Sequence, residues 1–131
     1  MRSVLPSDRP EKLAIRTRKF AVSVVRFYMS LPRSGEYFVL GRQLLRSGTS
    51  VGAQYREARR AKSKADFVSK MQGALQELDE TEYWLEVLDE AGLVDSGALE
   101  PLARETNELV SIFVSAVKTA KGTDPEVRSQ K

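Results

Sequence analysis

Four long stretches of this chain repeat apolar or small residues at alternating steps of three and four, and this feature limits the fold more than any other. The third stretch shows the stripe Phe67, Met71, Ala74, Leu78, Thr81, Leu85 and Leu88. The mean step of 3.5 residues is the repeat of α-helices that pack nearly parallel in a left-handed bundle. One such stripe is weak evidence, but four of similar length in 131 residues predict an all-α four-helix bundle.

Residues that typically begin or end helices lie at the boundaries of the four stripes. The predicted helices cover residues 11–31, 35–61, 64–91 and 98–121. Pro32 ends the first helix, and Ser63 is an N-cap for the third. Gly92 stands where a helix C-terminus needs a left-handed residue. Pro101 is awkward deep inside a helix, so we expect the fourth helix to begin within a couple of residues before it.

The short links between these helices predict the topology and the domain limits. Links of a few residues force neighbouring helices to run antiparallel, which gives an up-down-up-down bundle. We expect one domain over residues 11–121, after a flexible N-terminal segment 1–10. The tail 122–131 has nothing to bury and is predicted to be disordered.

The composition excludes many kinds of chemistry. The chain has no cysteine and no histidine, which rules out disulfides, thiol nucleophiles and histidine bases or metal ligands. A ferritin-like carboxylate metal site also needs a histidine in each Glu-x-x-His motif. No nucleophile–base pair or phosphate-binding loop is evident, so we expect no catalytic residues, no metal, no cofactor and no enzyme activity. Without a signal peptide or an apolar span, the protein is expected in the cytoplasm and not in a membrane.

The charges are divided unevenly along the chain. Residues 1–70 contain 16 bases and 5 acids, whereas residues 71–131 contain 5 bases and 13 acids. The densest group of bases is Arg56, Arg59, Arg60, Lys62 and Lys64. Bases at a helix C-terminus complement its dipole, but that needs only one or two charges. The group is therefore either a solvated helix end or a surface for a polyanion such as RNA or DNA. No aromatic residues alternate with the bases, so base-specific recognition is not indicated.

Two glycines lie in the middle of the second predicted helix. Gly48 and Gly52 are four residues apart and share one face. Each glycine costs about 1 kcal/mol relative to alanine in a helix interior, so something should compensate. Close approach of another helix is the favoured explanation, and a kink is the alternative.

A polar side chain, Gln54, falls on the stripe of the second helix, which consists of Tyr37, Leu40, Leu44, Ser47, Val51, Gln54 and Ala58. A buried amide needs hydrogen-bond partners, because leaving it unpaired costs about 1–3 kcal/mol. We predict a polar core network that sets the helix register, made of Arg46, Gln54, Glu57, Glu77 and Glu80.

The stretch QLLRSGTSVGAQYREARRAKSKADFVSKMQGALQELDETEYWLEVLDEAG resembles a family of four-helix-bundle proteins named for the intervening sequences of 23S rRNA genes. The residues that fall where the family pattern expects them are Gln43, Arg46, Ser47, Ser50, Val51, Ala53, Glu57, Ala58, Phe67, Lys70, Glu77, Glu80, Thr81, Trp84 and Leu85. The resemblance covers about residues 12–121. It departs from the pattern at Gln54, where the family usually has asparagine.

The resemblance implies a ring-shaped homopentamer with a proposed role in nucleic-acid binding. A related branch consists of accessory proteins of reverse transcriptases, which makes a protein-binding adaptor the alternative function. Tyr83 and Trp84 lie off the core stripe, where an aromatic residue belongs either to a second packing layer or to an interface. With a pentamer implied, we predict that both lie between subunits.

Overall fold

The structure is a computed structural model that describes residues 10–122. Within this range it contains four helices and no strand. The helices are α1 (Pro10–Ser30), α2 (Gly35–Arg59), α3 (Lys64–Glu90) and α4 (Ser96–Gly122). All four predicted helices are therefore confirmed, with their ends displaced by one or two residues. The segments expected to be flexible or disordered, residues 1–10 and 122–131, lie outside the described residues except for Pro10 and Gly122.

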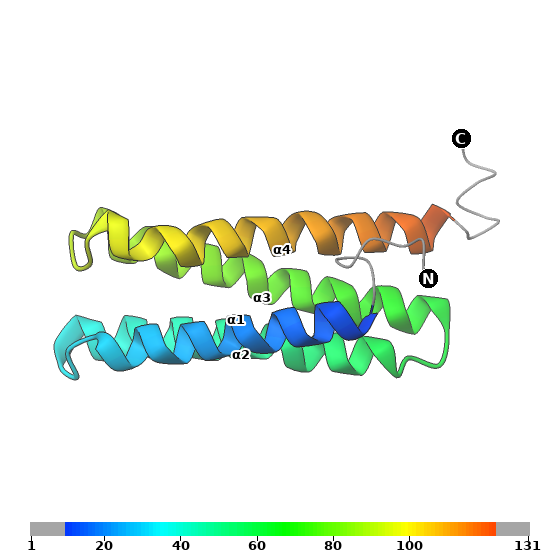
Figure 1. Ribbon diagram of the computed structural model, residues 1–131, viewed down its shortest axis with the longest axis horizontal. Coiled ribbons are helices and arrows are strands. Elements are labelled where there is room, and N and C mark those ends of the chain that lie inside the picture. Colours follow the sequence, from blue (N-terminus) through cyan, green and yellow to red (C-terminus); the bar gives the residue numbers. More distant parts are fainter. Residues whose placement is uncertain (1–9, 123–131) are drawn as a thin grey trace.

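The helices form an antiparallel bundle with up-down-up-down order (Figure 1). α1 packs along α2, α2 along α3 and α3 along α4, whereas α1 and α4 make few contacts with each other. The N-terminus of α1, the C-terminus of α2, the N-terminus of α3 and the C-terminus of α4 lie at the same end of the bundle (Figure 1). This end is called the α2–α3 end below. No described helix is both long enough and apolar enough to cross a membrane.

The boundaries of α3 and α4 show which of the predicted capping residues begin and end the helices. The Ser63 side chain accepts a hydrogen bond from the Asp66 amide at 3.0 Å, as the N-cap prediction required. Gly92 has a φ of 70°, the left-handed conformation expected after α3. The predicted start of α4 was too late, because Asp95 accepts backbone bonds from Ala98 and Leu99 and starts the helix at Ser96. Pro101 is tolerated inside α4 because it is exposed, so water can reach the carbonyl that it leaves unpaired.

The core follows the predicted stripes over most of their length, with a shift on α2 and another at the end of α4, where Val117 is buried and Ala116 is half-buried. On α3, every stripe residue from Met71 to Leu88 is buried. On α2, Leu44, Val51 and Ala58 are buried as predicted, but Gln54 is only half-buried. Tyr55 takes the core position instead, and its ring lies 5.7 Å from that of Phe113 on α4. The buried face of α2 is therefore turned toward α1 relative to the prediction.

The two glycines of α2 explain why its buried face is rotated toward α1. A Cβ atom added at Gly48 would lie 2.7 Å from Cγ2 of Val24 on α1. One added at Gly52 would lie 3.3 Å from Oγ1 and 3.5 Å from the backbone carbonyl carbon of Thr17, also on α1. Both glycines therefore lie against another helix, which confirms the close-packing prediction. Close approach of α1 draws the glycine face of α2 into the bundle.

Candidate nucleic-acid interface

The group of five bases lies where α2 ends and α3 begins. α2 ends at Arg59 with Arg60 as its C-cap, and α3 starts at Lys64 after the cap Ser63. The side chains of Arg56, Arg59, Arg60, Lys62 and Lys64, called the basic patch below, are all exposed. Arg60 and Lys62 lie in the short link between the helices, and the other three bases lie in the adjoining turns of α2 and α3. Long charged side chains remain in water because burial of an unpaired charge is costly.

Most of the basic patch carries charge without a nearby acidic partner. Within residues 10–122, no carboxylate lies within ion-pair distance of Arg56, Arg59, Arg60 or Lys62. The nearest acid of α3, Asp66, accepts instead from the Lys62 backbone amide and from Lys70 Nζ, both at 3.4 Å. The cations therefore keep their charge available to an outside anion.

The patch borders a groove between α1 and α2 with a volume of about 860 Å³. Arg18 of α1 and Lys70 of α3 join Arg56, Arg59 and Arg60 around it. Most of the uncharged residues that line the groove are small: Ala14, Thr17, Ala21, Thr49, Gly52 and Ala53, together with the larger Ile15 and Tyr55. Bases from three helices thus surround one depression. Three carboxylates, Glu11, Glu57 and Asp66, also border the groove.

Arg18 and Lys70 were not among the predicted site residues, because periodicity does not tell which neighbour a flanking side chain faces. Arg16, only two residues before Arg18, points the other way. Its guanidinium donates to both Glu105 oxygens, at 2.7 and 2.8 Å, and to Glu108 at 2.6 Å on α4. These hydrogen bonds, the one to Glu105 above all, raise the pKa of Arg16 above its ordinary value. Arg16 therefore ties α1 to α4 and is not part of the groove.

The predicted polar core network is wrong in its burial. Arg46 is exposed, and it pairs with Glu80 and, at 3.4 Å, with Glu77 on the surface between α2 and α3. Glu57 is exposed at the patch. Gln54 lies against α3, where its Oε1 is 3.0 Å from the place that a Cβ of Gly73 would occupy. A long charged side chain at the edge of a stripe can extend its charged end into water. The polar groups that remain in the core are therefore smaller ones.

Hydroxyl groups supply the polar contact in the core. Thr81 Oγ1 donates to Ser47 Oγ at 2.9 Å between α3 and α2, and both residues are fully buried. Thr81 Oγ1 also lies 2.8 Å from the Glu77 carbonyl oxygen, and Ser47 Oγ lies 3.3 Å from that of Leu44. Thr17 and Thr106 are buried on α1 and α4 and bond to carbonyls of their own helices. Both Ser47 and Thr81 belonged to the predicted stripes, so the signal was present.

Two aromatic residues of α3, Tyr83 and Trp84, are adjacent and differ in burial. Tyr83 is 56% exposed, and its ring meets that of Trp84 edge-on at 4.9 Å. Trp84 packs partly against the core of its own chain, and its buried indole Nε1 has no hydrogen-bond partner in the described chain. A buried N–H without a partner is unusual, because it costs about 1–3 kcal/mol. Placement of both rings between subunits stays a prediction.

The residues described by the structure contain no group of three or more acidic side chains arranged to hold a metal ion. Fold and surface together define the class: an all-α four-helix bundle with a basic groove at one end. The chain belongs to the family of 23S rRNA-intervening sequence proteins, whose pattern it matches over residues 12–115. The resemblance seen in the sequence is thereby confirmed.

A solved structure supports the same assignment. A protein of unknown function from the S23 ribosomal protein family of Bacteroides thetaiotaomicron superimposes with a TM-score of 0.78 and 38% sequence identity. The match covers 83% of this chain and 97% of that one. No match was found among curated proteins.

Proposed function

We propose that this protein is a non-enzymatic, self-associating bundle that binds RNA or DNA through its basic patch, without sequence specificity. The observation that carries the proposal is the groove bordered by bases of three helices, in which Arg56, Arg59 and Arg60 form no ion pair with any residue that the structure describes. Lysine and arginine contacts to phosphates release counterions, so such a surface binds any backbone of sufficient charge density.

Self-association strengthens weak phosphate contacts because each copy repeats the patch. Support for it comes from the outer face of α1, where Ile15, Val22 and Met29 follow one another at steps of seven. Their exposed fractions are 39%, 44% and 61%. An exposed apolar stripe with a heptad repeat is typical of a helix that packs against a further helix. A ring of five copies is the assembly that we propose, following the family resemblance.

The test reverses the charge at the patch. Arg59→Glu combined with Arg60→Glu should weaken binding to a mixed-sequence 20-base-pair duplex and to its single strands. Each lost phosphate contact should flatten the plot of log affinity against log salt by ~0.9 for duplex DNA. The charge-matched control reverses Arg26 of α1 and Arg33 of the α1–α2 link, which are both exposed and lie toward the opposite end of the bundle. Fluorescence anisotropy across a salt series gives both quantities, and light scattering reports the assembly.

Three results would count against this function. If neither duplex nor single strands bind at low salt, the proposal is wrong. If both double variants weaken binding equally, the patch has no special role. If the Arg59 and Arg60 reversal dissolves the oligomer, the patch is paired with acidic side chains of a neighbouring copy.

The second candidate is a protein-binding adaptor, for example an accessory subunit of a reverse transcriptase. The specific observation in its favour is the acidic outer surface of α3, where exposed Tyr83 is flanked by Asp79, Glu86 and Glu90. A preparation free of nucleic acid that captures one discrete protein, and loses it on Tyr83→Ala, would support the adaptor.

A further inference from the structure

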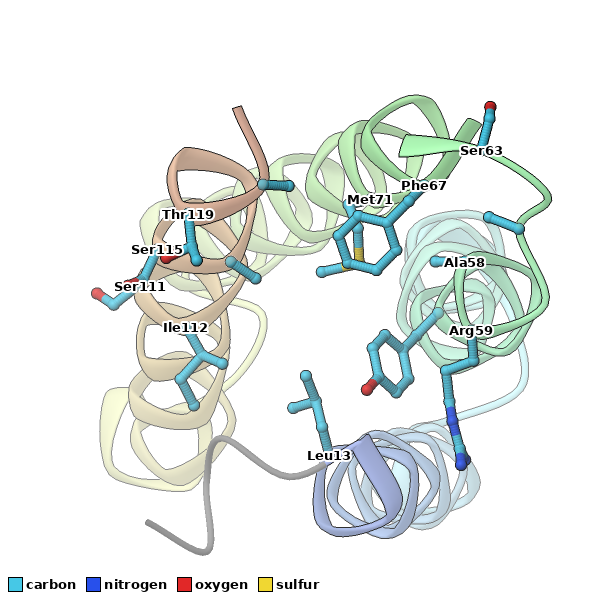
Figure 2. A pocket seen from close by; sticks show the side chains of 14 residues that line it. Leu13, Ala58, Arg59, Ser63, Phe67, Met71, Ser111, Ile112, Ser115 and Thr119 are labelled. Atoms are coloured by element: carbon cyan, nitrogen blue, oxygen red, sulfur yellow. The ribbon is translucent and has the colours of Figure 1, made fainter. Parts of the chain in front are cut away.

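A cavity of about 1250 Å³ opens at the α2–α3 end of the bundle, beside the basic groove. Side chains from all four helices line it: Leu13, Tyr55, Phe67, Met71, Ile112 and Ala116. Leu13, Phe67, Met71 and Ile112 point toward the same central space (Figure 2). α1 and α4 make few contacts with each other, and Leu13 of α1 and Ile112 of α4 both point into the space between these helices (Figure 2).

The lining has the composition of a small-molecule site. Its interior is apolar and aromatic, with Met71 completely buried and Tyr55 nearly so. Three exposed hydroxyl residues of α4, Ser111, Ser115 and Thr119, lie at the rim, with Ser111 and Ser115 directed away from the central space (Figure 2). Ligand pockets between helices of a bundle are typically apolar, with a few polar groups that orient the ligand.

Among residues 10–122, the cavity lining contains one charged side chain, and its charge is positive. This residue is Arg59, and it has no carboxylate partner in the described chain. Burial raises the pKa of Tyr55, and the positive charge of Arg59 opposes that rise. The Arg59 side chain extends from the end of α2 toward α1, at the border of the cavity (Figure 2). An apolar hollow with one cation at its border complements an apolar chain that carries one anionic head.

We propose that this cavity binds a free single-chain carboxylate, with its alkyl chain among Leu13, Phe67 and Ile112 and its carboxylate at Arg59. Burial of the alkyl chain provides most of the affinity, because each methylene is removed from water. The ion pair with Arg59 then selects the charged head, since a charge-assisted hydrogen bond is stronger than a neutral one. This ligand site goes beyond the proposed nucleic-acid function and does not depend on it.

Calorimetric titration of the full chain with octanoate, decanoate and dodecanoate, each below its micellar concentration, tests the proposal. Affinity should rise about fourfold for each methylene added until the cavity is full. Arg59→Gln should weaken decanoate binding about tenfold or more and leave 1-decanol unchanged. Lys118→Gln is the matched control, because Lys118 is exposed at the same end and does not line the cavity. Ala116→Phe should weaken both ligands by filling the cavity.

Each contrary result overturns the proposal. Absence of saturable decanoate binding would leave the cavity without this ligand class. Equal affinities for octanoate, decanoate and dodecanoate would show that the protein binds only the carboxylate charge. An equal loss for decanoate and 1-decanol in Arg59→Gln would remove Arg59 from the site. Binding that appears only after deletion of residues 1–9 would assign the cavity to the first residues of the chain itself.

Discussion

Replacement of Gly48 by alanine probes how tightly α1 and α2 pack. The added Cβ would lie 2.7 and 2.9 Å from the two Cγ atoms of Val24 and 3.2 Å from its Cβ. Val24 is completely buried, and a valine in a helix has one strongly preferred side-chain rotamer, so its methyl groups have nowhere to turn. The helices must therefore move apart, or the side chain must take a strained rotamer.

Two opposing effects set the size of the change in unfolding free energy. Alanine favours a helix interior over glycine by about 1 kcal/mol, whereas overpacking a core costs typically ~1–3 kcal/mol. With two contacts under 3.0 Å to a stiff neighbour, the overpacking should prevail. We expect Gly48→Ala to lower the unfolding free energy by about 1–2 kcal/mol.

Gly52→Ala is the matched control on the same helix. Its Cβ would meet Thr17 at 3.3 Å or more, which requires a shift of only a few tenths of an ångström. Helix propensity should then prevail, and we expect a change between zero and a stabilisation of about 1 kcal/mol. The two alanine variants should therefore change stability in different directions.

Urea denaturation at one fixed protein concentration measures both variants, because self-association would make the apparent stability depend on concentration. For a chain of this size, 1 kcal/mol corresponds to about 3–5 °C in melting temperature. In a double-mutant cycle, Gly48→Ala should become neutral or stabilising once Val24 is also alanine, because the clash is gone. If Gly48→Ala stabilises the protein with Val24 in place, the contact with α1 is not tight and the reasoning is refuted.

Three further variants test the buried polar contact and the subunit interface. Thr81→Val should lower the unfolding free energy by about 1 kcal/mol, since it keeps the shape of the side chain but removes the hydrogen bond to Ser47. In a Ser47→Ala background, urea denaturation should show a smaller loss. An equal loss would mean that the two hydroxyls do not interact. Trp84→Ala should weaken the oligomer more than the fold, as seen by light scattering, whereas an intact oligomer with a much lower melting temperature would place Trp84 in the core of one chain. Trp84→Phe separates the roles of ring and N–H: removal of an unpaired Nε1 should be neutral or stabilising, and a weakened oligomer would show that the N–H bonds to a neighbouring copy.

The sequence by itself determined the number of helices, their limits and most of the core. These properties depend on neighbours along the chain, such as the alternating steps of the stripe from Met71 to Leu88 or the cap at Ser63. Close packing at Gly48 and Gly52 was also predictable, because glycine in a helix interior has a cost that must be offset. The partner, α1, was not.

Positions on the flanks of a stripe were not determined by the sequence. Gln54 and Tyr55 are adjacent, and either one continues the alternating steps of three and four after Val51. The choice between them depends on how far α2 is rotated about its axis, and close contact with α1 sets that rotation. Arg46, expected in the core, lies on the surface for a related reason: its long side chain reaches Glu77 and Glu80 from the flank.

The candidate sites show the same division. The five bases of the patch were evident in the sequence because they lie within nine positions. Only the tertiary structure decided that Arg18 joins them while Arg16 binds Glu105, and that Arg59 also borders an apolar cavity. A helix turns by about 100° per residue, so side chains two positions apart face different neighbours. Which neighbour lies on each side is a property of the assembled bundle, and it follows from the packing of all four helices together.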